Sequence, residues 1–289
     1  MMLNFEGVQL DATDKKLKKQ LWRCLILSKA LLKEKLDANI YKLHNVISNI
    51  LFLRSKHRQI VRPNAQFRNI HFGKRCFILG TGPSLRNVNT NLLKNEIIFG
   101  VNFLIRSDVI SRITPQYYCL CDPVFHTTQV NGTLEILSAL PKTTFFLNIK
   151  AYDIIDGLDM DTKNIYYQHY DLAQHSDYIR LDMSKNMTAP FNVVIACIQN
   201  AIYMGFEEIY LLGCDFSAFI SSKNEHCYDK GDAPDRKELR GFALKQSSLE
   251  SFYHYALAKY ASRNNIRIYN STPNSFLDAY ERKSIEEIT

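Results

Sequence analysis

The segment Lys74-Arg75-Cys76-Phe77-Ile78-Leu79-Gly80-Thr81-Gly82-Pro83-Ser84-Leu85 decides the fold. Its apolar run, 76–79, has the length of a buried strand, and a turn with two glycines follows at once. Ligands of open α/β sheets bind beyond the carboxyl ends of such strands. The glycines let backbone amides approach a phosphate, and Ser84 adds a hydroxyl donor. The turn matches neither GxGxxG nor a Walker A loop, so a plain strand-to-helix turn stays the alternative.

Strand-like and helix-like stretches alternate on the C-terminal side of this turn. Strands are expected near 96–101, 117–121, 143–149, 165–170, 208–212 and 266–269. Helices are expected over 190–204, with Thr188 as cap and Gly205 as stop, and over 239–261. This alternation implies parallel pairing through right-handed crossovers. We therefore predict an α/β fold over residues 73–289: a Rossmann-like, doubly wound, mostly parallel sheet that forms a nucleotide-binding catalytic domain.

Residues 1–72 are expected to form a basic helical extension and linker. Leucines recur at helical spacing from Asp11 to about Ser55, and the polar, basic stretch 55–72 with Pro63 is typical of a linker. Residues 1–75 hold 16 Lys and Arg against 5 Asp and Glu, whereas the remainder holds 20 against 24. A nucleic-acid-binding fold would carry its positive charge on the domain itself, so no nucleic-acid partner is expected.

Composition places the chain in a reducing compartment. The seven cysteines are scattered without a CxxC pair, a pattern that suits a reducing cytosol better than a disulfide framework or a zinc site. Hydrophobic residues make up 46% of the chain, which is ordinary for a globular protein. No apolar stretch reaches the roughly 20 residues of a membrane span, and no signal peptide is recognisable. We expect a cytoplasmic protein. Its basic, leucine-rich extension either docks on the inner face of the membrane or packs on the domain or on a second subunit of a homo-oligomer.

Polar residues follow several of the predicted strands and would meet at one edge of the sheet. Asn102 follows the second strand, Asp122 the third, and Asp215 the most apolar one. A carboxylate or amide at this edge can bind ribose hydroxyls or a base edge. Capping of the next helix is the alternative for Asn102 and Asp122.

A long polar loop, 221–240, follows Asp215 and contains His226, Tyr228 and Asp229. Loops of this length are often lids. His226 is the general-base candidate because it is an imidazole in a polar loop near the ligand edge; a solvated loop histidine is the alternative. No HxxxH or CxxC spacing indicates a metal site.

The stretch 73–85 resembles the opening of the 6-hydroxymethylpterin pyrophosphokinase-like (MptE-like) proteins, many of them bacterial and encoded with surface-polysaccharide genes. It also resembles the bacterial sialyltransferase family of mucosal pathogens, which opens with Gly-Asn-Gly-Pro-Ser-Leu; here Thr81 replaces the asparagine. Further matches follow in order over roughly 200 residues. They are Asn102, Asp122-Pro123 (Asn-Pro in the sialyltransferases), 205–211, Gly213-x-Asp215-Phe216 and Pro273-Asn274-Ser275.

The resemblance implies a Rossmann-like glycosyltransferase of surface-polysaccharide biosynthesis, in capsule or lipopolysaccharide assembly. It would transfer a sialic acid-like sugar from a CMP-activated donor to a glycan or lipid-linked glycan, without a metal or other cofactor. The nucleotide contacts would come from Gly80, Thr81, Gly82, Ser84, Asn102, Asp122 and Thr188. His226, Asp215 and Tyr228 are the catalytic candidates, with His226 as base on the acceptor hydroxyl. The family's histidine is expected near the start of the helix from Leu239, whose only histidine, His254, lies deeper.

Two other functions stay open. One is a diphosphotransferase acting on a pterin, with Asp122 and Asp215 binding Mg²⁺. The other is a nucleotide-sugar-binding subunit without catalytic activity.

Overall fold

The structure is a computed structural model that describes residues 28, 32, 36–158, 160–175, 178–223, 225–229, 237 and 239–288. In this part of the chain nine strands form one sheet, in the order β6-β5-β4-β3-β2-β1-β7-β8-β9, and every neighbouring pair is parallel. The strands are β1 (Arg75–Leu79), β2 (Ile97–Val101), β3 (Tyr117–Leu120), β4 (Thr144–Asn148), β5 (Ile165–Leu172), β6 (Asn186–Thr188), β7 (Glu208–Leu212), β8 (Arg267–Asn270) and β9 (Glu281–Arg282). The predicted α/β, Rossmann-like fold is confirmed.

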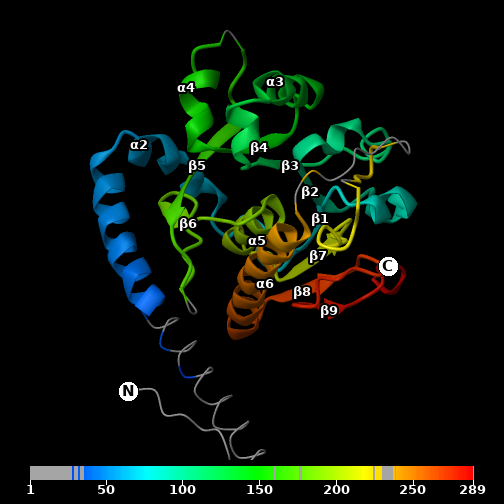
Figure 1. Cartoon of the computed structure of the whole chain (residues 1–289). Coiled ribbons are helices and arrows are strands. Elements are labelled where there is room, and N and C mark those ends of the chain that lie inside the picture. Colours follow the sequence, from blue (N-terminus) through cyan, green and yellow to red (C-terminus); the bar gives the residue numbers. More distant parts are fainter. Residues whose placement is uncertain are drawn as a thin grey trace, which may run out of the picture.

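Helices cover the sheet (Figure 1). They are α2 (His57–Val61), α3 (Val130–Ala139), α4 (Tyr152–Ile155), α5 (Val193–Tyr203) and α6 (Arg240–Arg263), joined by short 3-10 turns. The sequence misplaced the start of α5: its cap is Asn192, whose side chain accepts from the backbone N–H of Ile195, and Thr188 belongs to β6. Gly205, with a φ of 88°, ends this region as expected for a residue that must turn left-handed.

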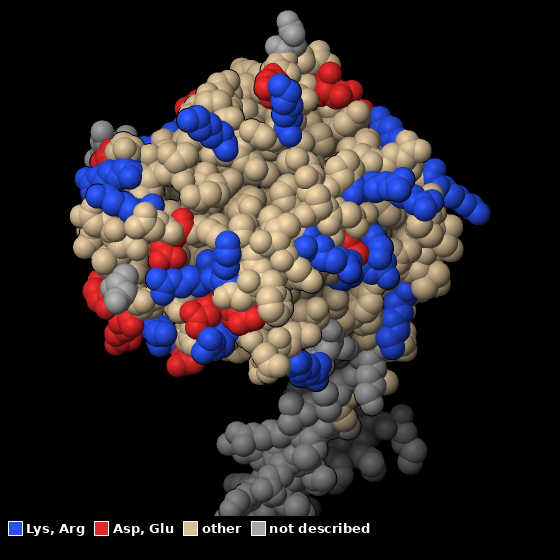
Figure 2. All heavy atoms as spheres, turned by 180° about the vertical axis from the view of Figure 1, so that it is seen from behind, with Lys and Arg blue, Asp and Glu red and all other residues tan. Residues whose placement is uncertain are grey.

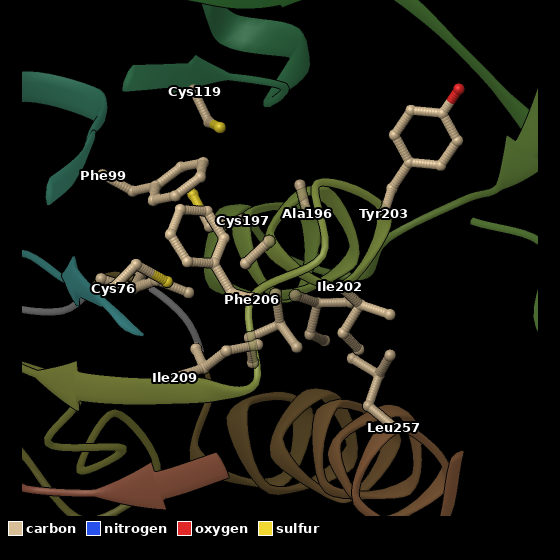
Figure 3. Packing of buried hydrophobic residues seen from close by; sticks show 14 of the residues in the cluster. Cys76, Phe99, Cys119, Ala196, Cys197, Ile202, Tyr203, Phe206, Ile209 and Leu257 are labelled. Carbon is tan, nitrogen blue, oxygen red and sulfur yellow. The ribbon is translucent and has the colours of Figure 1, made fainter. Parts of the chain in front are cut away.

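Alternation along the strands divides the core into two layers. In β1, Cys76 and Ile78 belong to the cluster under α5 and α6, whereas Phe77 and Leu79 belong to the cluster on the opposite face. Figure 3 shows the first cluster, in which Phe99 and Cys119 from the sheet meet Cys197 of α5. All six described cysteines are buried and free, and each packs as a small hydrophobic residue.

The linker interpretation of residues 55–72 is wrong, because this stretch packs as part of the domain. It forms α2 and a 3-10 turn over Arg62–Phe67, in which Val61, Asn64 and Phe67 are buried. The Asn64 amide donates to the carbonyls of Tyr167 and Met183. Three inward-facing residues among many polar ones were too sparse to be recognised in the sequence.

A helix over residues 36–54 precedes this stretch and lies beside β5 and β6 (Figure 1). Polar residues dock it: the Asn45 amide donates to the Ala173 carbonyl, and Ser48 Oγ donates to an Asp171 carboxylate oxygen 2.6 Å away. Phe52 of this helix is buried, but nine of its apolar residues over positions 36–53 are 42–63% exposed. The expected start of this helix near Asp11 lies outside the described residues.

Charged residues are interspersed on the back of the molecule. Figure 2 shows Lys and Arg side chains, with some Asp and Glu, around an uncharged centre. None of the described helices is both long and apolar enough to cross a bilayer.

Candidate functional site

The order in which successive strands are added to the sheet changes side between β1 and β7. Strands β1 to β6 run outward on one side, and β7 pairs with β1 on the other. The carboxyl ends of β1 and β7 therefore form the topological switch point of the sheet, the position at which open α/β sheets bind ligands. A cavity of about 340 Å³ occupies this position. It is bounded by the glycine turn 80–83, the loop 213–218, the start of α5 (192–194), and Glu250 and His254 of α6. The loop that follows residue 218 contributes Ser221, Lys223, Glu225 and His226.

The glycine turn is held against the loop that follows β7. Gly80 N–H donates to the Leu212 carbonyl and Gly82 N–H donates to the Gly213 carbonyl, both at 2.8 Å. A Cβ on Gly82 would come within 1.9 Å of Asp215 Oδ2, and one on Gly80 within 2.4 Å of the Gly213 oxygen. Both glycines are thus required by the contact between the two loops.

Asp215 closes this contact from the other side. Its carboxylate accepts from the Ser84 backbone N–H at 3.1 Å and from Ser84 Oγ at 2.8 Å. The amides of Gly80, Gly82 and Ser84 are therefore already hydrogen-bonded within the fold. From the sequence we expected the glycines to leave backbone amides open to a phosphate. These three N–H groups are not open, because each already donates to another part of the fold.

The sequence motif Pro273-Asn274-Ser275 supports the same loop. Ser275 Oγ donates to the Cys214 carbonyl at 2.6 Å, and the Cys214 N–H donates to Thr272 Oγ1 at 3.0 Å. Asn274 has a φ of 52°, a left-handed turn that asparagine tolerates. The segment after β8 thus holds the β7 loop in place through its hydrogen bonds to Cys214.

His226 lies at the edge of the cavity. Its Nδ1 lies 3.4 Å from Thr81 Oγ1, and the neighbouring Cys227 N–H donates to the Thr81 carbonyl at 2.8 Å. Its ring stacks on Tyr228 with centroids 5.0 Å apart. Arg86 fixes the loop by donating to the carbonyls of His226 and Asp229.

Tyr228 is positioned behind His226. Burial raises the pKa of its phenol to about 12, so the hydroxyl stays protonated at neutral pH. Tyr228 lines a neighbouring cavity of about 360 Å³ and not the one at the switch point. Its described contact with the site is therefore made through the ring of His226.

The remaining predicted residues lie apart from the cavity lining. The Asp122 carboxylate caps the next 3-10 turn by accepting from the Val124 N–H at 3.0 Å, the alternative that the sequence left open. Thr188 is fully buried in β6, where its hydroxyl accepts from the Arg180 N–H at 2.8 Å. Asn102 adopts a left-handed φ of 48°, and its buried side-chain oxygen has no hydrogen-bond partner.

Two residues of α6 at the cavity were not among the predicted site residues: Glu250 was not considered, and His254 was set aside because it lies deep in the helix. Glu250 and His254 are one helical turn apart and both line the cavity. Burial raises the pKa of Glu250 to about 7 and lowers the pKa of His254 to about 3. Perturbed ionisable groups in a cleft are typical of functional sites. In the sequence both are single polar residues of a long polar helix.

A family model, 6-hydroxymethylpterin diphosphokinase MptE-like, matches residues 44–220. The chain belongs to the MptE-like family. The matched range begins inside the helix over 36–54 and ends in the β7 loop, so it includes the glycine turn and Asp215.

Solved structures resemble this MptE-like chain in fold. The MAf glycosyltransferase from Magnetospirillum magneticum AMB-1 is 14% identical with a TM-score of 0.47, and the match covers 80% of this chain and 38% of that one. The sialyltransferase CstII from Campylobacter jejuni, in complex with cytidine-5'-monophosphate, is 17% identical with a TM-score of 0.44, covering 73% and 85%. The structure of CstII with a trisaccharide acceptor and CMP is 17% identical with a TM-score of 0.43, and the match covers 72% of this chain and 85% of that one. No curated protein matches the sequence.

Proposed function

We propose that this chain is a glycosyltransferase that binds a CMP-activated, sialic acid-like sugar in the cavity at the switch point. One observation carries the proposal: the two motifs that most resemble the sialyltransferases, the turn 80–85 and Gly213-x-Asp215-Phe216, pack against each other and border the same cavity. The two motifs are more than 130 residues apart in the sequence, and the parallel pairing of β1 with β7 brings them together at one edge of the sheet.

In the proposed reaction a hydroxyl oxygen of the acceptor glycan attacks the anomeric carbon of the donor sugar. The bond from that carbon to the phosphate oxygen breaks, and CMP leaves with the electron pair. His226 takes the acceptor's proton, as the sequence predicted. Its place beside Thr81 holds the imidazole at the mouth of the nucleotide cavity.

The phosphate requires donors that the fold has not already used. In α5 the Asn192 side chain accepts from the Ile195 N–H, and Val193 and Val194 of the first helical turn border the cavity. A helix N-terminus stabilises negative charge. We therefore assign the leaving phosphate to the space between the glycine turn and the start of α5, where Thr81 and Lys223 also border the cavity.

The family description favours the second candidate, a diphosphotransferase that acts on a pterin. That reaction would need carboxylates converging on Mg²⁺. Asp215 borders the cavity with both oxygens bonded to Ser84, while Asp122 caps a turn outside its lining. Among the described residues no group of three or more His, Cys, Asp and Glu is arranged to hold a metal ion. The present arrangement does not fit a two-aspartate metal site.

Thermal unfolding of the full chain with CMP, UDP, GDP and ATP tests the proposal, each with and without Mg²⁺. A ligand at about 100 times its Kd stabilises the fold by about 2.7 kcal/mol, which raises Tm by several degrees for a chain of this size. We expect the largest shift with CMP, independent of Mg²⁺. A Mg²⁺-dependent shift with ATP alone would instead support the diphosphotransferase. Release of CMP from a CMP-sugar in the presence of an acceptor separates a transferase from a binding subunit.

A peripheral position at the inner membrane surface remains part of the proposal. The helix over 36–54 exposes apolar side chains beside Lys42 and Arg54, the combination that interfacial helices use on anionic bilayers. A lipid-linked acceptor would then reach the site from the surface on which the enzyme is docked.

A further inference from the structure

The wall of the cavity formed by α6 carries two titratable side chains that the proposed reaction does not use. His254 is 1% exposed, and its Nδ1 lies 2.9 Å from the Tyr280 hydroxyl. Because burial lowers the pKa of His254 to about 3, its imidazole is neutral at physiological pH. It therefore adds a polar but uncharged group to this wall.

Glu250, one turn earlier, is half-buried and borders the same cavity. Among the described residues it has no hydrogen-bond or ion-pair partner. Burial raises the pKa of its carboxyl to about 7. A carboxyl that is withdrawn from water without a partner destabilises a fold, so its position at a ligand cavity indicates a use for it.

The other charged groups that line the cavity in the described part of the chain are engaged or exposed. Asp215 accepts two hydrogen bonds from Ser84, Glu225 pairs with Arg86 at 2.8 Å, and Lys223 is exposed. His226 contacts Thr81. A ligand that brings phosphate or carboxylate oxygens into this space meets the Asp215 charge already present. A second negative charge on Glu250 would oppose its binding further.

We propose that Glu250 binds the ligand in its neutral form, donating a hydrogen bond to an anionic oxygen, so that ligand binding takes up a proton. The anionic oxygen belongs either to the phosphate or to the carboxylate of the donor sugar. This inference rests on the proposed function only in requiring an anionic ligand in the cavity.

The direction of the pH dependence follows from proton linkage. Below about pH 7 the carboxyl of Glu250 is protonated in both the free and the bound protein, so it adds no pH dependence. Above that pH the free protein loses the proton and the complex keeps it. Affinity should therefore fall by up to tenfold per pH unit.

Calorimetric titration of the full chain with CMP measures the uptake. At about pH 8, in two buffers of different ionisation enthalpy, we expect close to one proton taken up by the wild type. Glu250→Gln keeps a neutral donor of the same shape, so it should bind CMP at least as tightly at this pH without taking up that proton. Glu225→Gln is the matched control, since Glu225 borders the same cavity but pairs with Arg86; its uptake should equal that of the wild type. His226→Gln removes the imidazole contribution.

Two ligand arms distinguish the sources of the anionic oxygen. Uptake with CMP alone assigns the hydrogen bond to the phosphate, whereas uptake only with a CMP-nonulosonate donor assigns it to the sugar carboxylate. If CMP does not bind but UDP or GDP binds with an uptake that Glu250→Gln abolishes, the CMP donor is wrong and the role of Glu250 stands. Binding of both CMP and the CMP-nonulosonate donor without uptake, uptake that survives in Glu250→Gln, or no binding of any of these anions overturns the inference.

A second measurement needs no variant. Diazo reagents that esterify neutral carboxylic acids should label Glu250 of the wild type near pH 7, as peptide mass spectrometry would show, and a bound nucleotide should protect it. A Glu250 that stays unlabelled while surface carboxylates react at lower pH, or that is labelled equally with saturating ligand, contradicts the inference.

Discussion

Replacing His254 by glutamine should remove an acid sensitivity from the fold. The imidazole is 1% exposed, and burial lowers its pKa from 6.5 to about 3. Below pH 6.5 the His254 imidazole therefore binds a proton in the unfolded chain, whereas in the folded chain it stays unprotonated until the pH approaches 3. Stability from this group is complete above pH 6.5 and is lost as the pH falls from 6.5 towards 3.

The magnitude follows from the pKa difference. At about pH 4.5, two units below the unfolded pKa, the loss is roughly 2–3 kcal/mol at about 1.4 kcal/mol per unit. Glutamine does not titrate, and its amide can still bond to the Tyr280 hydroxyl. We expect His254→Gln to lose some stability at pH 7.5 through repacking, but to lose less than the wild type on acidification.

Urea unfolding of both proteins at about pH 7.5 and pH 4.5 gives the free energy of unfolding at each pH. The loss on acidification is then compared between the wild type and His254→Gln. Other carboxylates titrate equally in both proteins and cancel. Glu250 is one turn away and titrates in the same window, so the comparison is repeated in the Glu250→Gln background to remove coupling. The reasoning is refuted if the free energy of unfolding falls by the same amount on acidification with and without His254.

Three further predictions concern the turn, the base and the exposed helix. Gly82→Ala should weaken CMP binding at least tenfold and lower Tm, because its Cβ would displace the Asp215 carboxylate from Ser84; unchanged affinity in a calorimetric titration would show that the turn is not the nucleotide site. His226→Ala should lower turnover about 10²–10⁴-fold with little change in donor affinity, and a rate within a few-fold of wild type would place the base elsewhere. Leu43→Gln combined with Ile50→Gln, on the exposed face of the helix over 36–54, should release the full chain from anionic vesicles at low salt. Phe276→Gln, exposed far from that helix, is the control; equal sedimentation of the double variant and wild type would exclude docking through this face, and a change in size-exclusion volume would assign the face to a second subunit.

Truncation at Lys74 is unsuitable as a membrane test, although the sequence invites it. The stretch 55–72 that would be removed contains Val61 and Asn64, which are fully buried in the domain. Loss of binding by the truncated chain would report unfolding as readily as loss of a membrane contact.

The sequence alone determined the elements that depend on local pattern. The apolar runs of β1 to β5, β7 and β8 stand out against polar surroundings, and alternation with helices implies a parallel sheet. The glycine turn and Gly205 were recognisable because glycine marks special backbone geometry wherever it occurs. The strands β6 and β9, of three and two residues, were missed because runs so short show no periodicity.

Tertiary structure decided which polar residues meet. Asp215 and Ser84 are 131 residues apart, so only the packing of two loops shows that the amides of the turn are already used. Glu250 and His254 sit in a helix with no clear apolar face, where each reads as an ordinary solvated residue. Only the fold turns that side of α6 towards the cavity and withdraws both groups from water. That loss of solvation, which no sequence pattern encodes, shifts their pKa values in opposite directions and makes them part of the site.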